Sequence, residues 1–260
     1  MDLCEILFHS TVQIKSTRHT SAISGTGFLF AFSTNEEDKI IPVIITNRHI
    51  VEDATRGQLV FSLKDNDGNY VHEKTHSFLY DDFSRAWFFH PDPLVDLCVM
   101  PIHQLYKEYR PNPYSLYVSY VTEKDIPSSE EIKQFSHIEN IIVVGYPSGI
   151  IDDTHNLPLV RSGITASSLH YDFKGQPEFL IDAAIYGGSS GSPVFVYNNG
   201  CFNTKRGTIF GQRTKLVGVN KATYQHQISN QIAVPNGLGV AIHARKILDF
   251  KPILLSKLEP

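Results

Sequence analysis

The chain has 260 residues, with 23 Lys and Arg against 27 Asp and Glu, a formal net charge of −4. Hydrophobic residues make up 42% and charged residues 19%, a globular composition that argues against intrinsic disorder. The near-neutral charge argues against a dedicated nucleic-acid partner, and without a run of about 18 apolar residues no membrane helix is expected.

The cysteine content predicts a reducing compartment. Cys4, Cys98 and Cys201 are the three cysteines, too few and odd in number for a disulfide framework. The N-terminal residues show no basic region ahead of an apolar stretch, so no secretory signal is expected. The sequence therefore predicts a cytoplasmic protein.

Short β-branched segments separated by turn residues predict an all-β fold. The expected strands in chain order are Thr11–Lys15, Gly27–Phe32, Ile40–Thr46, Gln58–Leu63, Arg85–Phe89 and Val95–Met100, then Ile141–Tyr146, Leu159–Thr165, Phe179–Ala184, Pro193–Tyr197, Lys215–Lys221 and Gly239–Ile242. Two sets of about six indicate two six-stranded antiparallel β-barrels. We expect the N-terminal barrel over residues 1–110, a tyrosine-rich connection over 111–135 and the C-terminal barrel over 136–260.

Two short helices interrupt this pattern. Ser128 followed by Glu131 ahead of Ile132 is typical of a capping box at a helix start. A second helix is expected from about Ala244 to Phe250, near the C-terminus.

Two apparent motifs do not fit their surroundings. His72 to His76 reads H-E-x-x-H, but it follows a turn signal in an expected hairpin, and on a strand the two histidines lie about 13 Å apart. They cannot share a zinc ion there, and no metal site is expected. Gly187 to Gly191 reads G-x-S-x-G, yet no acid stands between it and the last histidine, His243, as an α/β-hydrolase requires.

Three segments together carry the features of nucleophilic catalysis. His49 ends a β-branched strand, Asp96 opens an apolar one, and Ser190 stands in a glycine-rich turn. A serine hydroxyl needs a base within hydrogen-bond reach, and the base needs an acid that sets its tautomer. We expect His49 to take the Ser190 proton, Asp96 to orient His49, and the N–H groups of Gly188 and Ser190 to bind the developing oxyanion.

These motifs resemble those of the chymotrypsin/trypsin-fold serine proteases. Thr46-Asn47-Arg48-His49 is similar to the catalytic-histidine box, Asp96-Leu97-Cys98-Val99 to the aspartate strand, and Gly188-Ser189-Ser190-Gly191-Ser192-Pro193 to the serine box. Asp182-Ala183-Ala184-Ile185 before the serine is closest to disulfide-free peptidases of the high-temperature-requirement type. Such relatives usually add a PDZ domain, for which no sequence remains here. Relatives made as zymogens have an aspartate where Ser189 stands, so activation by N-terminal cleavage is not expected.

The resemblance also implies a primary specificity pocket. Its base falls at Ala184 with Ile185 beside it, one wall at Asn220, Lys221 and Ala222, and the entrance at Gly239. Ala184 supplies no carboxylate, and Asp182, two residues away on the same strand face, is expected to lie too far toward the barrel interior to serve. The sequence therefore predicts an uncharged residue, aliphatic or small, before the scissile bond. Residues 191–248 contain no Asp or Glu, which favours acidic residues at outer subsites.

The sequence thus predicts a serine endopeptidase that acts on polypeptide substrates through an acyl-enzyme. No cofactor, nucleic acid or membrane is expected as a partner, and no activating protein is identified. The alternative is a catalytically latent or inactive two-barrel module that binds peptides or proteins.

Overall fold

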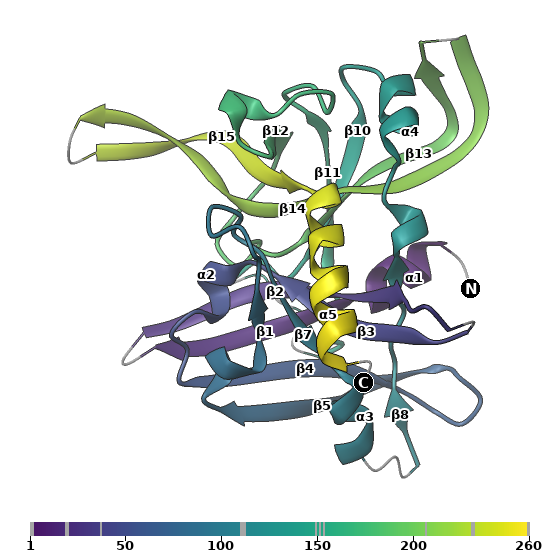
Figure 1. Ribbon diagram of the computed structural model, residues 1–260, viewed down its shortest axis with the longest axis vertical. Helices are drawn as coiled ribbons and strands as arrows, with labels where there is room; N and C mark the ends of the chain where they lie inside the picture. The colour runs from purple at the N-terminus through teal and green to yellow at the C-terminus, as the bar shows by residue number, and fades with distance from the viewer. Residues whose placement is uncertain are drawn as a thin grey trace.

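Two β lobes make up the protein (Figure 1). The computed structural model describes residues 3–18, 21–36, 38–109, 113–148, 150, 152, 154–205, 207–229 and 232–258. Within these residues the N-terminal lobe is a nine-stranded sheet and the C-terminal lobe a closed barrel of six strands. The all-β, two-lobed architecture and the six-stranded C-terminal barrel are confirmed, whereas the N-terminal lobe has more strands than the six expected.

The N-terminal sheet has the strand order β5-β4-β1-β2-β3-β7-β6, with β8 paired to β4 and β9 paired to β2. Its strands are β1 (Thr11–Arg18), β2 (Ser21–Ser33), β3 (Ile40–Thr46), β4 (Arg56–Lys64), β5 (Tyr70–Asp81), β6 (Phe88–Phe89), β7 (Cys98–Pro101), β8 (Ser115–Leu116) and β9 (Val121–Thr122). The helices between them are α1 (Leu3–His9), α2 (Arg48–Val51), η1 (Phe83–Ala86), α3 (His103–Glu108), η2 (Glu123–Asp125) and α4 (Ser129–Gln134). Strands β8 and β9, from the connecting segment, thus pair with the N-terminal sheet.

The C-terminal barrel closes in the order β10-β11-β12-β15-β14-β13. Its strands are β10 (Asn140–Gly145), β11 (Leu159–Thr165), β12 (Glu178–Ala183), β13 (Pro193–Thr204), β14 (Gly207–Ser229) and β15 (Ile232–His243). The helical elements are η3 (Phe173–Gly175), η4 (Ala244–Phe250) and α5 (Lys251–Leu258). The ladders β13–β14 and β14–β15 continue past the barrel as two projecting hairpins (Figure 1).

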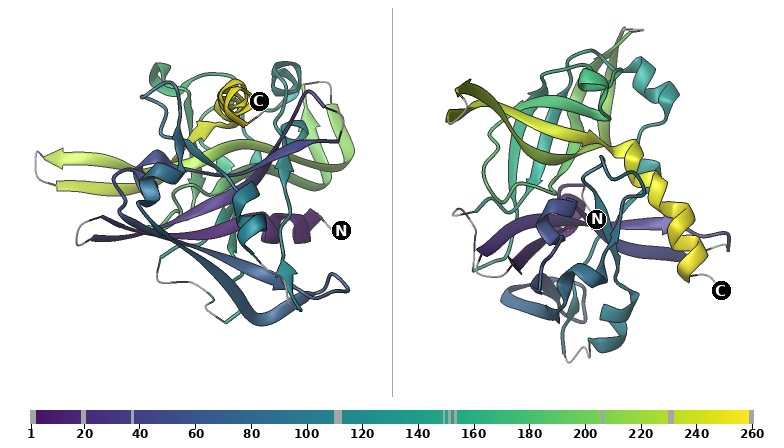
Figure 2. Two further views of the ribbon diagram at one scale, coloured as in Figure 1. Left: turned by 60° about the horizontal axis from the view of Figure 1, so that its bottom comes forward. Right: turned by 60° about the vertical axis from the view of Figure 1, so that its left-hand side comes forward.

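One apolar core joins the two lobes. Phe28, Phe30 and Phe32 of β2 are fully buried in the same cluster as Phe195 of the barrel. Phe250 and Leu254, from η4 and α5, belong to this cluster as well, and Figure 2 shows α5 running from the barrel to the N-terminal sheet. Burying one such side chain contributes about 1.5–3 kcal/mol. The lobes are therefore held together mainly by apolar contact.

The predicted strand bounds are confirmed where the hydrophobic pattern defines the strand. Strands β3 and β11 have the expected bounds. The Arg85–Phe89 prediction is wrong except for its last two residues, because Phe83 is buried by a 3-10 turn. The barrel strands β13, β14 and β15 exceed their expected lengths, since backbone pairing in a projecting hairpin requires no apolar alternation.

The predicted helix start is confirmed in detail. The Glu131 N–H donates to the Ser128 hydroxyl at 3.2 Å, and the Ser128 N–H donates to the Glu131 carboxylate at 2.8 Å. The C-terminal helix begins at Ala244 as expected, but its first part is a 3-10 helix and α5 continues it to Leu258.

His72 and His76 lie on the edge strand β5, as the hairpin interpretation requires. The described residues contain no group of three His, Cys, Asp or Glu side chains placed to hold a metal ion.

Cys98 and Cys201 are free thiols, the first buried and the second exposed. Burial raises the pKa of the Cys98 thiol well above its usual range. The side chain of Cys4 lies outside the described residues. Among the helices that the structure describes, none is long and apolar enough to cross a membrane.

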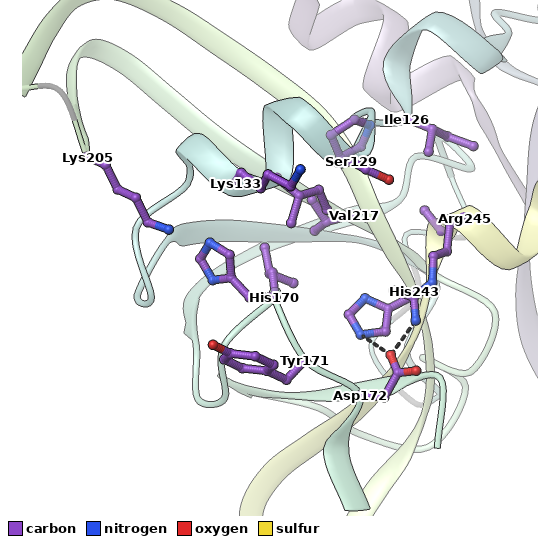
Figure 3. Close-up of a pocket in the computed structure, with 14 residues that line it drawn as sticks. Ile126, Ser129, Lys133, His170, Tyr171, Asp172, Lys205, Val217, His243 and Arg245 are labelled. Carbon is purple, nitrogen blue, oxygen red and sulfur yellow. Dashed lines mark hydrogen bonds and ion pairs between the residues drawn. The ribbon is translucent and has the colours of Figure 1, made fainter. Parts of the chain in front are cut away.

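A cavity of about 620 Å³ lies between α4, residues 169–172 and η4 (Figure 3). Asp172 there is engaged by Arg245, and His243 Nε2 lies 3.5 Å from the same carboxylate. Burial lowers the pKa of His243 to about 4, so this imidazole is neutral at physiological pH. None of the expected catalytic residues lines this cavity.

Replacing Phe30 tests whether the shared core couples the lobes. Phe30 is fully buried, so Phe30→Ala should lower the free energy of unfolding by about 3–5 kcal/mol. Fluorescence of Trp87 and far-UV circular dichroism should still report one coincident unfolding transition in denaturant. Phe210→Ala is the matched control, because Phe210 is 86% exposed and its loss should cost less than about 0.5 kcal/mol. Two separate transitions in the wild type would contradict a shared core.

Candidate active site

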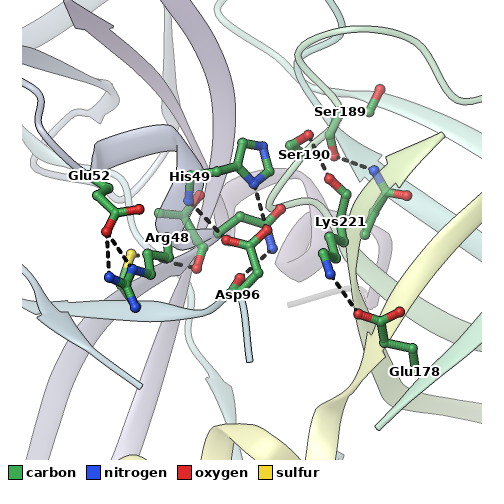
Figure 4. Close-up of polar contacts among 12 residues, drawn as sticks. Arg48, His49, Glu52, Asp96, Glu178, Ser189, Ser190 and Lys221 are labelled. Carbon is green, nitrogen blue, oxygen red and sulfur yellow. Dashed lines mark hydrogen bonds and ion pairs between the residues drawn. The ribbon is translucent and has the colours of Figure 1, made fainter. Parts of the chain in front are cut away.

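His49 lies on a short helical turn at the end of β3. The turn α2 follows Asn47, whose side-chain amide donates to the carbonyl oxygen of Asp96 at 2.9 Å. Ile50 and Val51 on the same turn are buried in the core of the N-terminal sheet. These anchors leave the His49 side chain, 44% exposed, at the surface that faces the barrel (Figure 4).

Both carboxylate oxygens of Asp96 contact His49. Asp96 Oδ2 lies 2.6 Å from His49 Nδ1, and Asp96 Oδ1 accepts the His49 backbone N–H at 2.9 Å. Because an ionised carboxylate only accepts, His49 Nδ1 carries the proton in this pair and Nε2 keeps its lone pair. The imidazole is therefore oriented in the tautomer that a general base needs.

Ser190 lies on a tight turn between β12 and β13. Gly188 and Gly191 have φ angles of +81° and +84°, a region that disfavours side chains. A Cβ at Gly191 would lie 1.9 Å from the Thr26 carbonyl oxygen, so no larger residue fits there. The buried Asn220 donates its side-chain N–H to the Ser189 carbonyl at 2.9 Å and supports the turn from behind.

Thr26 of β2 connects this turn to the N-terminal lobe. Its N–H donates to the Ser190 carbonyl at 2.9 Å, and its hydroxyl donates to the Gly188 carbonyl at 3.1 Å. The same hydroxyl accepts the Tyr146 N–H at 2.9 Å, and the Thr26 carbonyl accepts the Thr46 hydroxyl at 2.7 Å. No sequence motif marks Thr26, whose only local sign is its place between two glycines.

One cleft of about 380 Å³ contains His49, Asp96 and Ser190. In this structure the Ser190 hydroxyl donates to the Lys221 carbonyl at 2.9 Å (Figure 4). Within the described part of the chain it makes no hydrogen bond to His49, so Ser190 must rotate about χ1 to reach the imidazole.

Two backbone N–H groups beside Ser190 are available to an anion. The amides of Gly188 and Ser190 donate to no oxygen among the residues that the structure describes. Donors of this kind stabilise an oxyanion because they are fixed before charge develops. The turn can therefore hold the negative charge of a tetrahedral intermediate.

The expected specificity residues divide between the cleft and its surroundings. Ile185, Lys221 and Ala222 line the cleft, together with Tyr186, Gly187 and Thr223. Ala184 is exposed and lies outside the cleft lining, and Asn220 is buried behind the serine turn.

Gly239 does not open an entrance, because a Cβ there would lie 2.8 Å from Ile181 Cγ1 and 3.0 Å from Ile185 Cγ1. Ile185 therefore fills the space expected for a deep pocket. Asp182 is exposed and does not line the cleft.

A serine, a histidine and a carboxylate from two β lobes, meeting in one cleft, place the protein in the class of two-lobed serine hydrolases. The chain belongs to the trypsin-like peptidase family, because the family model of the trypsin-like peptidase domain matches residues 25–202. No protein of curated function matches the chain in sequence.

Solved structures with the same fold are distant in sequence. The HtrA-type protease AlgW with a tripeptide is 16% identical with a TM-score of 0.53, over 98% of this chain and 64% of that chain. A variant of AlgW with a decapeptide is 15% identical with a TM-score of 0.51, over 96% of this chain and 64% of that chain. The chain thus spans less than two thirds of these relatives, and the likeness concerns the fold.

Asp96→Asn tests the orienting carboxylate. The amide cannot accept from both His49 N–H groups, so the imidazole loses the tautomer with a free Nε2. We expect kcat for peptide hydrolysis to fall by about 10⁴ while the melting temperature changes little. The exposed Asp182→Asn is the matched control and should retain wild-type kinetics. Near-wild-type kinetics in Asp96→Asn would remove Asp96 from the site.

Proposed function

We propose that the protein is a serine endopeptidase with Ser190 as nucleophile, His49 as general base and Asp96 as the orienting acid. The 2.6 Å contact between His49 Nδ1 and Asp96, in the same cleft as Ser190, carries this proposal. Membership of the trypsin-like peptidase family supports it.

The reaction proceeds through an acyl-enzyme. Ser190 Oγ attacks the peptide carbonyl carbon while His49 Nε2 takes the hydroxyl proton, and the N–H groups of Gly188 and Ser190 bind the resulting oxyanion. The C–N bond then breaks, and the imidazolium gives its proton to the leaving amine. His49 next deprotonates a water that attacks the ester, and Ser190 leaves with its proton restored.

The substrate main chain is expected to bind along β14. Strand β13 pairs with β14 only up to Val219, and a register shift between Asn220 and Ala222 interrupts the ladder to β15. The β13-side edge of β14 beyond Asn220 therefore has no strand partner among the described residues. An extended peptide can add there as a strand. The AlgW structures likewise contain a bound tripeptide or decapeptide.

One observation favours a second candidate, a latent or inactive peptide-binding module. The Ser190 hydroxyl is held by the Lys221 carbonyl instead of by His49. In an active enzyme, a substrate N–H that binds this carbonyl would release the hydroxyl toward His49. In a binding module, the hydroxyl would remain on Lys221.

A fluorophosphonate probe distinguishes the two candidates. An active site of the proposed kind should label stoichiometrically at Ser190, and Ser190→Ala should abolish labelling. Ser192→Ala is the matched control, because the buried Ser192 hydroxyl has no hydrogen-bond partner in the described part of the chain and its removal should leave labelling intact. A folded wild-type protein that does not label, with or without peptide, would overturn the endopeptidase proposal.

The cleft predicts an uncharged small or aliphatic residue before the scissile bond. Ile185 and Ala222 line it, and its only carboxylate among the described residues, Asp96, is engaged by His49. A buried Lys or Arg without a counter-ion would cost several kcal/mol. Profiling of a peptide library by mass spectrometry should therefore show cleavage after small or aliphatic residues.

Ile185→Ala sharpens this prediction. Removing the side chain that covers Gly239 should shift the preference toward larger apolar residues such as Leu or Phe. Dominant cleavage after Lys or Arg in the wild type would contradict the assignment of the pocket.

A further inference from the structure

Arg161 of β11 contacts the loop that carries Ser190 at both of its ends. Its Nη1 donates to the carbonyl oxygen of Ala184 at 2.9 Å, directly after β12 ends. The same nitrogen donates to the hydroxyl of Ser189 at 2.9 Å, directly before Ser190. One guanidinium nitrogen thus joins the first and the penultimate residue of the 184–190 loop.

The other hydrogen bonds of the 184–190 loop show what the two Arg161 contacts add to its support. The Ser189 N–H donates to the Tyr186 carbonyl at 3.1 Å, and the Tyr186 N–H reaches the Ser189 hydroxyl only at 3.4 Å. From outside, Ser148 donates its N–H to the Gly187 carbonyl at 2.7 Å, and Thr26 and Asn220 donate to the carbonyls of residues 188–190. Arg161 is the contact that reaches the start of the loop, at Ala184. Ser189 precedes the proposed nucleophile Ser190 and is fully buried. Arg161 supplies a charged hydrogen-bond donor to its hydroxyl.

Arg161 is half-buried, with its Nε and Nη2 atoms shielded from solvent. Among the described residues these two atoms have no hydrogen-bond partner, and no carboxylate forms an ion pair with the guanidinium. Burial lowers the pKa of Arg161 from its usual value. An unpaired buried cation is costly, and such groups cluster at functional sites.

Arg161 does not line the cleft that contains His49, Asp96 and Ser190.

We propose that Arg161 is a positioning residue for the reaction, which holds the 184–190 loop so that the amides of Gly188 and Ser190 converge on the oxyanion. This inference rests on the proposed endopeptidase function. Without the two Arg161 hydrogen bonds, the loop samples arrangements in which the N–H of Gly188 or Ser190 turns away from the oxyanion. The transition state then loses one hydrogen-bond donor, whereas binding of the peptide substrate along β14 remains.

Arg161→Met tests the proposal, because methionine keeps part of the side-chain volume and removes the donors. We expect kcat to fall by about 10²-fold or more with a smaller change in KM, and fluorophosphonate labelling to slow in parallel. Arg213→Met is the matched control. Arg213 is a buried arginine of the same barrel, paired with Glu139 away from the cleft, and its loss should lower the melting temperature with little effect on kcat.

Two further measurements separate positioning from a merely structural role. Guanidinium ion at a non-denaturing concentration should restore activity to Arg161→Ala, and urea at the same concentration should not. Arg161→Lys should retain part of the activity as long as the lysine is protonated and His49 is neutral. Burial lowers the pKa of such a lysine, so the activity of the variant should fall as pH rises through that pKa. The pH–activity profile of the wild type should lack this alkaline decrease, because arginine stays protonated.

The outcomes are distinguishable. A folded Arg161→Met or Arg161→Lys with wild-type kcat at every pH would overturn the role of Arg161. If Arg161→Met does not fold, the pH profile of Arg161→Lys decides, and a profile parallel to that of the wild type would overturn the proposal. Failure of the wild type to label with fluorophosphonate would instead overturn the proposed function itself.

Discussion

The hydrogen bonds of Thr26 join the two lobes at the point where the cleft is assembled. Its N–H and hydroxyl donate to the carbonyls of Ser190 and Gly188, and its own carbonyl accepts from Thr46, three residues before His49. His49 and Asp96 come from the N-terminal sheet and Ser190 from the barrel. The relative position of the two groups therefore depends on how one buried threonine connects the lobes.

Hydrogen bonds and apolar burial have different parts in this connection. Each Thr26 bond contributes about 0.5–1.5 kcal/mol net, whereas each large side chain of the shared core contributes about 1.5–3 kcal/mol. The core that includes Phe30, Phe195 and Leu254 thus supplies most of the free energy that holds the lobes together. Apolar contact permits small sliding movements, and directional bonds do not. Thr26 therefore sets the register within a contact that the core stabilises.

Charge is distributed unevenly around the cleft. Asp96 places a carboxylate against His49, where positive charge develops when the imidazole takes a proton. Arg161 places a guanidinium nitrogen against the hydroxyl of Ser189, the residue before Ser190. Lys221 lines the cleft, and its ammonium is paired with Glu178 at 2.8 Å. This pairing weakens the sequence-based expectation of acidic residues at outer subsites.

The sequence by itself determined the strand pattern, the helix start at Ser128 and the segments that contain His49, Asp96 and Ser190, because local periodicity, capping and glycine content encode these features. It could not identify Thr26 or Arg161, since no motif marks either residue and the loop that each contacts is not adjacent in the chain. The tertiary structure alone decided that Ile185 covers Gly239 and that the Ser190 hydroxyl points to Lys221. Such features depend on which strands become neighbours when the barrel closes, and no short stretch of sequence contains that information.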